Sequence, residues 1–333
     1  MIEKINLLVS QQRKAGIFPC ANWAFMDKDK KSTFLEGYAQ ITPEKEVLKP
    51  DMLFDLASIT KVVCTGSVVL KLWEEGKLDI DVPFSTYYPS FQDNRVSLRH
   101  LLTHTSDINP FIKDRDILND EELKEAFNYL TVGENLGKSC QYTDTGTVLM
   151  GFMLEKIYQK DAQDIFQELV LNPLGLHNSK FQPIVPASLA VPTEVTENRG
   201  LIRGQTHDPK AFVLGKHAGS AGLFSTLADM MRYIEEVFFK QTFLKPETIE
   251  ALLQDFSPLK NQNRSLGWDM KFDKAGNPFL FHSGFTGTFL LLDPRRKKAF
   301  VFLSNRVHPH NFREEYLKNR DIIINKYLQL VSD

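Results

Sequence analysis

The spacing of apolar residues changes along the chain, and each spacing predicts a type of element. Near the N-terminus apolar residues recur at helical spacing, which predicts an amphipathic helix with four residues on one side: Ile2, Ile5, Leu8 and Val9. The segment 20–39 contains two apolar runs around a polar turn at residues 27–31, a pattern typical of a β-hairpin.

A second hairpin is predicted near the C-terminus. The apolar runs 285–293 and 298–305 flank a turn at residues 294–297. Apolar residues then return to helical spacing from about residue 313 to residue 330, which predicts a long amphipathic helix.

The middle of the chain shows helical spacing and capping residues. One helix is predicted from Ser58 to about Glu75, with Gly76 at its C-terminal end. Polar residues that favour helix N-caps precede four further helical segments: Ser97, Asn119 or Asp120, Asp144 or Thr145, and Ser225 or Thr226. The segment 183–222 has little periodicity and is predicted to be rich in loops.

This order of elements predicts an α+β architecture with an antiparallel sheet built from both ends of the chain. We expect residues 1–75 and 215–333 to form a discontinuous sheet lobe. Residues 76–214 would then form an inserted, mostly helical lobe.

Composition and charge exclude several classes of function. The chain has 333 residues, of which 42% are hydrophobic and 25% charged, as in ordinary globular proteins. Its formal net charge of −2 argues against a nucleic-acid partner, which would require a basic surplus. Its apolar runs are too short for a membrane span. The oligomeric state has no signature in the sequence.

The N-terminus and the cysteines bear on location and cofactors. Charges interrupt the apolar residues of the N-terminal segment, so we expect no secretory signal and a cytoplasmic protein, unless a signal has been removed. Cys20, Cys64 and Cys140 lack CxxC spacing, and the histidines lack the spacing of metal ligands. We therefore expect no disulfide framework, metal or other cofactor, and we expect His104 and His207 to be structural.

The first candidate for chemistry is the pair Ser58 and Lys61, inside the apolar run 56–63. Three residues apart on a helix, the two side chains share one face at about 5–6 Å between Cβ atoms. If Ser58 begins the helix, its backbone N–H has no intrahelical partner. The positive helix end and the apolar neighbours should lower the pKa of Lys61, so that a neutral lysine could accept the serine proton.

A Ser-x-x-Lys pattern alone is more often a helix cap with a surface lysine than a catalytic pair. A second copy, Ser257 and Lys260, lies in a polar stretch that favours this structural interpretation. The first copy has candidate partners in Tyr142 and Asp144, the only Tyr-x-Asp or Tyr-x-Asn in the chain. The phenol could relay the serine proton, and the carboxylate could hydrogen-bond the lysine. Taken alone, this motif would be a helix cap beside a half-buried tyrosine.

A third segment begins at His282. The small residues Ser283 and Gly284 precede Phe285 and an apolar strand, and small residues at a strand edge let a substrate approach the backbone. A backbone N–H here could pair with that of Ser58 to hold an oxyanion. Three other [His/Lys]-x-Gly matches occur, beginning at Lys14, His217 and Lys274. The copy at His282 is preferred because a strong strand follows it.

Together these segments resemble the serine β-lactamase and penicillin-binding-protein superfamily, and most closely its class C β-lactamase-related esterases and peptidases. FDLASITK resembles the nucleophile motif, YTD stands where the family has Tyr-x-Asn or Tyr-Ser-Asp, and HSG stands where it has Lys-Thr-Gly or His-x-Gly. SLRHLLTHTSDI and AGLFSTLADMMRY are similar to two other recurrent segments. The matches run in family order from about residue 15 to residue 305.

The resemblance implies a β-lactamase/DD-peptidase-like fold, with terminal helices flanking the sheet and the site at the junction of the two lobes. Ser58 would be the nucleophile, and Lys61 its general base or proton relay. Tyr142 would be a second acid and base, with Asp144 as the polar partner of the lysine. His282 would line the substrate side of the edge strand.

The resemblance also implies acyl transfer through an acyl-enzyme, with the N–H groups of Ser58 and Phe285 as the oxyanion hole. Two departures bear on the substrate. His282, in place of lysine, is mostly neutral at pH 7, and Asp144, in place of asparagine, adds a negative charge. Both disfavour an anionic β-lactam, so we expect preference for esters or less charged amides and weak or absent β-lactamase activity.

Three functions remain open. The leading one is an esterase-like serine hydrolase that acts through an acyl-enzyme on small ester or amide substrates, with weak or no β-lactamase activity. The alternative within the same class is a D-amino-acid peptidase or carboxypeptidase acting on cell-wall-derived peptides. The alternative of another class is a non-catalytic binding or sensor protein, against which the presence of Ser58, Lys61 and Tyr142 argues.

Overall fold

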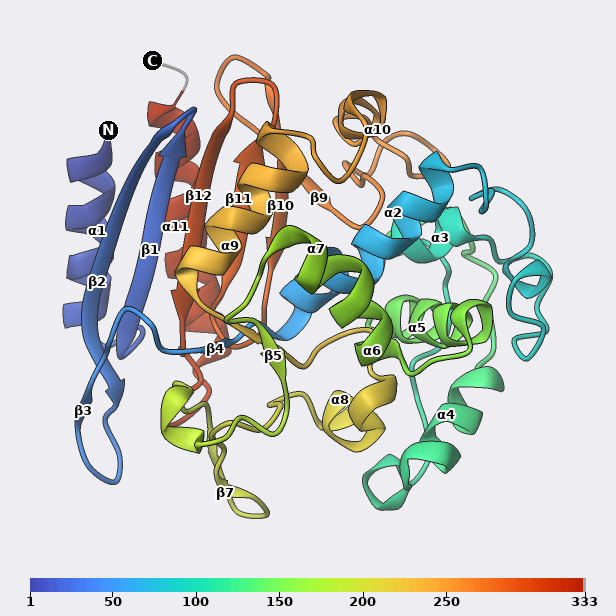
Figure 1. Cartoon of the computed structure of the whole chain (residues 1–333), viewed down its shortest axis with the longest axis horizontal. Coiled ribbons are helices and arrows are strands. Elements are labelled where there is room, and N and C mark those ends of the chain that lie inside the picture. The colour runs from blue at the N-terminus through green and yellow to red at the C-terminus, as the bar shows by residue number, and fades with distance from the viewer. Residues whose placement is uncertain (332–333) are drawn as a thin grey trace.

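A seven-stranded antiparallel sheet forms the centre of the protein, whose computed structural model describes residues 1–331 (Figure 1). The strand order is β3-β2-β1-β12-β11-β10-β9. Both ends of the chain supply strands, which confirms the α+β architecture. The strands are β1 (Cys20–Asp27), β2 (Lys30–Gln40), β3 (Glu46–Val47), β9 (Asp269–Phe272), β10 (Pro278–Ser283), β11 (Phe289–Asp293) and β12 (Lys298–Ser304).

The two terminal helices, α1 (Ile2–Lys14) and α11 (Arg313–Leu330), lie beside each other on one face of the sheet (Figure 1). Alternation along β1 explains this packing, because successive side chains of a strand point to opposite faces. Trp23 and Phe25 join the core under the terminal helices, whereas Ala24 and Met26 join the core on the other face. The predicted helices at both ends are confirmed.

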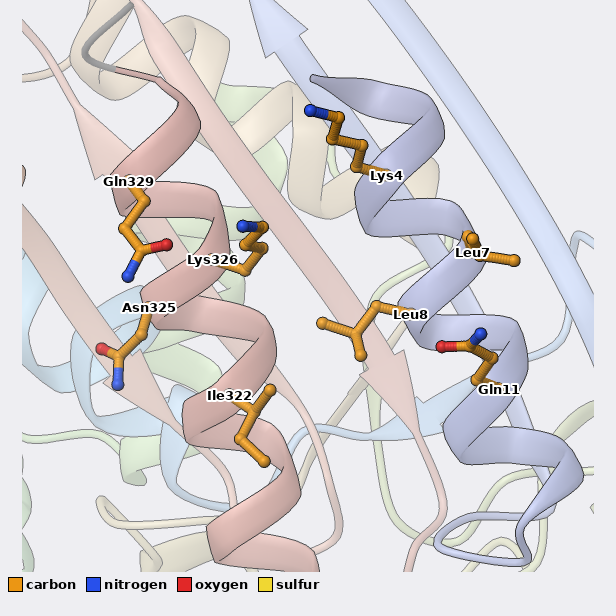
Figure 2. Close-up of a pocket in the computed structure, with 8 residues that line it drawn as sticks. All are labelled: Lys4, Leu7, Leu8, Gln11, Ile322, Asn325, Lys326 and Gln329. Atoms are coloured by element: carbon orange, nitrogen blue, oxygen red, sulfur yellow. The ribbon is translucent and has the colours of Figure 1, made fainter.

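A groove runs along the outer side of the two terminal helices, and Figure 2 shows the side chains that line it, among them Leu7, Leu8 and Ile322. The segment that carries Ser58 packs instead into the core on the opposite face, through Ile59 and Val62. This groove is therefore not part of the candidate site.

The helix α9 lies across the other face of the sheet, and most of the other helices from the middle of the chain lie to one side of the sheet (Figure 1). The helix α9 contacts β1 and β12 directly. These helices are α2 (Ser67–Glu74), α3 (Leu98–Leu102), α4 (Asp120–Asn128), α5 (Thr145–Tyr158), α6 (Ala162–Phe166), α7 (Asn172–Leu174), α8 (Pro209–Leu214), α9 (Leu227–Ile234) and α10 (Pro246–Ala251).

Two small sheets complete the fold. In the first, β8 (Leu223–Ser225) lies between β4 (Phe54–Asp55) and β5 (Lys180–Phe181), and β4 leads directly to Ser58. In the second, β6 (Val195–Thr196) pairs with β7 (Gly200–Leu201). Among the described residues, no helix has the length and apolar character needed to cross a membrane.

Most predicted helix starts agree with the structure, and one differs in an informative way. Ser97 forms a capping box, and the side chains of Asn119 and Thr226 accept hydrogen bonds from the first turns of α4 and α9. Asp144 occupies the N-cap position of α5 but makes no capping hydrogen bond with its side chain. Its carboxylate is used elsewhere, as described below.

Two elements differ from the sequence prediction. His282 was expected to begin a strand, but it lies near the end of β10, an additional strand that pairs with both β9 and β11. The segment from Ser58 to Glu75 is helical but irregular, with a 3₁₀ turn (Ala57–Ile59) and a π-helical turn (Lys61–Gly66) before α2.

Candidate active site

A strained turn presents Ser58 immediately after β4. The preceding residue, Ala57, has a φ of 45°, a left-handed conformation that is unusual for a residue other than glycine. The buried carboxylate of Asp55 stabilises the turn, because it accepts hydrogen bonds from the N–H of Ala57 at 2.8 Å and from the N–H of His207 at 2.7 Å. Backbone strain held by surrounding contacts is common at functional sites.

Lys61 contacts Ser58 directly. Its Nζ donates to Oγ of Ser58 at 2.7 Å, to Oδ1 of Asp144 at 2.7 Å and to the carbonyl oxygen of Ser220 at 3.1 Å. These three acceptors satisfy the three protons of an ammonium group. The side chain is only 3% exposed, so the lysine is buried with its partners.

The π-helical turn that begins at Lys61 depends on Gly66. A Cβ atom on Gly66 would lie 2.9 Å from the carbonyl oxygen of Lys61, a distance that real Cβ atoms do not adopt. Single π-helical turns within helices occur frequently at functional sites. Glycine therefore permits the local widening of the helix that carries the lysine.

The expected charge state of Lys61 was wrong. Burial lowers its pKa, but the adjacent carboxylate of Asp144 more than offsets this effect, and the pKa lies above the ordinary lysine value. The sequence argument included burial and the helix end but not a buried ion pair. Lys61 is therefore an ammonium at rest and donates a hydrogen bond to Ser58.

Asp144 joins two lysines instead of capping its helix. Its Oδ2 accepts from Nζ of Lys210 at 2.5 Å, while Oδ1 accepts from Lys61. Burial raises the pKa of Asp144, but the two ammonium groups together lower it well below the usual value for aspartate. The carboxylate is therefore ionised and shared between two positive charges.

Lys210 was not identified from the sequence. It lies on α8, within the segment predicted to be rich in loops, and no motif in its vicinity distinguishes it. Its presence also changes the charge argument. Two ammonium groups and one carboxylate leave the cluster of Lys61, Asp144 and Lys210 with one net positive charge, so Lys210 offsets the negative charge that Asp144 adds.

Tyr142 lies at the mouth of the site and is 44% exposed. The Nζ of Lys61 lies 5.4 Å from its ring centroid. The ring of His104 also lies next to Tyr142, with 4.5 Å between the two ring centroids. Burial lowers the pKa of His104 to about 3, so this histidine is a neutral support for the tyrosine.

His282 reaches the site from the end of β10. Its ring centroid lies 6.1 Å from that of Tyr142 and 6.3 Å from that of Trp268. Burial, assisted by the charge of Lys61, lowers its pKa well below the ordinary histidine value, so the ring is neutral. Among the described residues, neither ring nitrogen has a hydrogen-bond partner.

The turn after His282 is fastened to the turn that carries Ser58. Thr286 and Thr288 donate through their hydroxyl groups to the carbonyl oxygens of Asp55 and Leu56, at 2.7 and 3.1 Å. A Cβ atom on Gly284 would lie 2.3 Å from the carbonyl oxygen of Leu56, so only glycine permits this approach. The structure thereby brings the HSG segment against the residues that precede Ser58.

The remaining residues of this turn have distinct surroundings. Ser283 accepts a hydrogen bond from Nη1 of Arg320 at 3.2 Å. The ring of Phe285 stacks on the ring of His207, with 5.4 Å between centroids, and the guanidinium of Arg306 lies 4.5 Å from the centroid of Phe285. The side chain of Phe285 therefore has two defined contacts although it is partly exposed.

The second histidine candidate, His217, is engaged elsewhere. Its Nδ1 lies 2.6 Å from Oε1 of Glu155 and 3.7 Å from Oδ1 of Asp161, and ligand atoms of these three residues could surround a metal ion. Glu155 also accepts from Lys124 and from the backbone N–H of Ala162. This carboxylate therefore already connects three parts of the helical region.

The family model for β-lactamases matches residues 5–323, and the chain belongs to the β-lactamase family. A relative from Escherichia coli K12, described as "Putative D-alanyl-D-alanine carboxypeptidase", is 26% identical over 366 residues, which cover 92% of this chain and 83% of the relative.

Solved structures of the same fold include enzymes of several kinds. A class C β-lactamase has a TM-score of 0.73 at 19% identity, covering 97% of this chain and 95% of that one. The D-amino acid amidase of Ochrobactrum anthropi SV3 has a TM-score of 0.76 at 17% identity, covering 100% and 99%. These similarities confirm the β-lactamase-like fold.

Proposed function

We infer that this protein is a serine hydrolase in which Ser58 forms an acyl-enzyme with a small ester, amide or peptide substrate. The contact that carries this inference is the buried Nζ of Lys61, which lies 2.7 Å from Oγ of Ser58 and 2.7 Å from Asp144. Such a lysine holds the serine in one position and lies where it can exchange the proton that the serine loses.

The charge of Lys61 sets the order of the first step. An ammonium cannot accept the serine proton, so Lys61 must first release one proton to solvent. The neutral lysine then accepts the proton of Ser58 as the serine attacks the substrate carbonyl. Tyr142 is half exposed, and its ring lies 5.4 Å from Nζ of Lys61. It is our candidate for carrying a proton between the buried lysine and the leaving group.

The backbone N–H groups of Ser58 and Phe285 are proposed as the oxyanion hole. The hydroxyl groups of Thr286 and Thr288 support this role, because they fasten the second turn to the residues before the serine. A fixed pair of donors stabilises the negative charge that develops on the carbonyl oxygen. His282, with two nitrogens that lack protein partners among the described residues, would meet the substrate beside it.

The site is proposed to lie between the two lobes. Ser58, Lys61 and His282 come from the segments 1–75 and 215–333, whereas Tyr142, Asp144 and Lys210 come from the segment 76–214. The hydrogen bonds from the two lysines to Asp144 join these segments across the site.

A neutral His282 supports a preference for esters or weakly charged amides over β-lactams. Nitrocefin and an activated ester of similar leaving-group quality provide the test. We expect ester turnover with nitrocefin turnover that is weak or absent, and nitrocefin efficiency equal to that of a dedicated β-lactamase would contradict the preference.

A D-amino-acid peptidase is the second candidate, and the name of the Escherichia coli relative favours it. The net positive charge of the lysine–aspartate cluster is also compatible with a substrate that carries a carboxylate. Release of D-alanine from a peptide ending in D-Ala-D-Ala, with none from its L-Ala-L-Ala counterpart, would select this candidate over the esterase.

Covalent labelling separates an enzyme from a binding protein. The wild type, Ser58→Ala and Ser257→Ala are treated with a fluorophosphonate probe, and the intact mass of each is measured. We expect one adduct on the wild type and on Ser257→Ala but none on Ser58→Ala. An unlabelled wild type, also after treatment with an activated ester and a penicillin, would favour a non-catalytic binding protein.

A further inference from the structure

Lys210 is the least expected member of the site. It projects from the short helix α8 and is 18% exposed on its side chain, while its Nζ lies 2.5 Å from Oδ2 of Asp144. The Nζ of Lys61 lies 2.7 Å from the other oxygen of the same carboxylate, Oδ1. Ser58, Lys61, Asp144 and Lys210 thus form a continuous chain of hydrogen bonds.

The two lysines act on Asp144 in opposite senses. The negative charge of Asp144 binds the proton on Lys61 more tightly and so delays the release that acylation requires. A second ammonium beside the same carboxylate reduces this effect, because like charges disfavour each other. An asparagine at residue 144 would have no charge to offset and would not require the second lysine.

We propose that Lys210 is a positioning residue for acylation of Ser58. It holds one oxygen of Asp144, so that the other oxygen keeps Lys61 against the serine, and its charge offsets that of the carboxylate. This role rests on the proposed function of Ser58 as the nucleophile. In place of a neutral asparagine at residue 144, this chain therefore has a carboxylate on Asp144 and an ammonium group on Lys210, whose charges offset each other.

Other charged and titratable groups surround the pair. Asp208, also near α8, adds negative charge near Lys61, and Arg264 adds positive charge near the histidines of the site. Among the described residues, the charged and titratable groups that act on the site include Lys210 on α8 and Asp208 before it, Asp144 and Tyr142 at the start of α5, Lys61, His104 after α3, His282 on β10, and Arg264. The variants below change only Lys210 and Asp144, so this background is constant.

The test is the rate of Ser58 acylation by a neutral activated ester, followed by intact mass from about pH 6 up to the pH at which the rate levels off, so that the midpoint of the rising limb is covered. Removing a positive charge raises the pKa of a nearby base such as Lys61. Lys210→Met is therefore expected to move the rising limb of the rate upward by about one pH unit, which makes acylation about tenfold slower at a fixed pH on that limb. Lys210→Arg keeps the charge and is expected to keep the wild-type midpoint.

Asp144→Asn supplies the opposite change. Loss of the carboxylate is expected to move the limb to lower pH, although poorer positioning of Lys61 lowers the maximum rate. The double variant Asp144→Asn with Lys210→Met has the same net charge as the wild type. Its midpoint is therefore expected to return toward the wild-type value.

Three results decide the matter. An unlabelled wild type would refute the function of Ser58 itself, whereas a labelled wild type leaves Lys210 to be judged on its own variants. A slower Lys210→Met with an unchanged midpoint would overturn the proposal in favour of a structural brace for α8. Failure of Lys210→Arg to retain the midpoint would also overturn it. Lys210→Gln serves in place of Lys210→Met if thermal unfolding shows that the methionine variant is not folded.

Discussion

Two Ser-x-x-Lys segments of this chain have the same spacing and different environments. Lys61 is buried and donates to Ser58, Asp144 and a backbone carbonyl. Lys260 is exposed, and its Nζ donates to the carbonyl oxygen of Asp255 at 2.9 Å. The backbone of Lys260 has a φ of 55°, so that segment does not continue as a helix.

The contrast shows that spacing is insufficient to make a catalytic pair. At the first segment the helix places both side chains on one face, and a carboxylate from a distant part of the chain completes the contact. At the second, the lysine braces its own loop. A reactive serine requires this tertiary environment, because an exposed lysine is protonated and mobile.

Removing each lysine should give the largest difference between the two segments. We expect Lys61→Met to slow acylation of Ser58 by about 10³-fold, since proton transfer by a positioned group contributes about 10²–10⁴-fold. Lys260→Met should leave the rate within about twofold, because exposed polar contacts contribute little. The measurement is the rate of adduct formation by intact mass, and equal rates for the two variants would contradict the assignment of Lys61.

Two His/Lys-x-Gly segments permit a parallel comparison. Alanine at Gly284 would collide with the carbonyl oxygen of Leu56, whereas a Cβ on Gly276 would meet nothing within 4 Å. We expect Gly284→Ala to reduce acylation by about 10²-fold, because the turn must move away from Ser58. Gly276 has a positive φ, which an alanine adopts less readily. Gly276→Ala should therefore lower the melting temperature without slowing acylation. Normal acylation in folded Gly284→Ala would show that this close approach is not required.

The charge of Lys61 predicts the pH dependence. Because its pKa lies above the ordinary value, the neutral form is scarce at neutral pH and increases as the pH rises. Acylation should therefore increase by about tenfold per pH unit from neutral pH upward. A rate by intact mass that is independent of pH between about pH 6 and about pH 9 would contradict an ammonium at rest.

The smallest expected effect concerns stability and distinguishes the two serines. Ser257 is buried, and its Oγ has no hydrogen-bond partner among the described residues, so Ser257→Ala should leave the melting temperature close to that of the wild type. Ser58→Ala removes a hydrogen-bond acceptor from the buried ammonium of Lys61, so this variant should have a slightly lower melting temperature than the wild type. Thermal unfolding measures both changes, and a larger loss in Ser257→Ala would contradict this ranking.

The sequence predicted what local spacing determines. The two hairpins, the terminal helices and several helix starts follow from periodicity and capping residues, and helical spacing predicted that Ser58 and Lys61 lie on one face. The motif YTD also suggested a carboxylate near Lys61, and the structure places Asp144 there.

Features that depend on packing were not predictable in the same way. Lys210 reaches Asp144 through a tertiary contact between segments far apart in the sequence, and its own segment shows no pattern of a site. The charge of Lys61 was misjudged because burial and the ion pair act in opposite directions, and only the distances decide which dominates. The strand β10 was not predicted because its apolar run, 279–281, is only three residues long, and its pairing with β9 and β11 depends on the tertiary fold.

Locating the covalent adduct tests the central claim most directly. After labelling with a fluorophosphonate, trypsin should release Ser58 in the peptide 46–61 and Ser257 in the peptide 241–260. We predict that the added mass lies on Ser58 in the first peptide and that the second is unmodified. An adduct on the second peptide, or on any residue other than Ser58, would contradict the account.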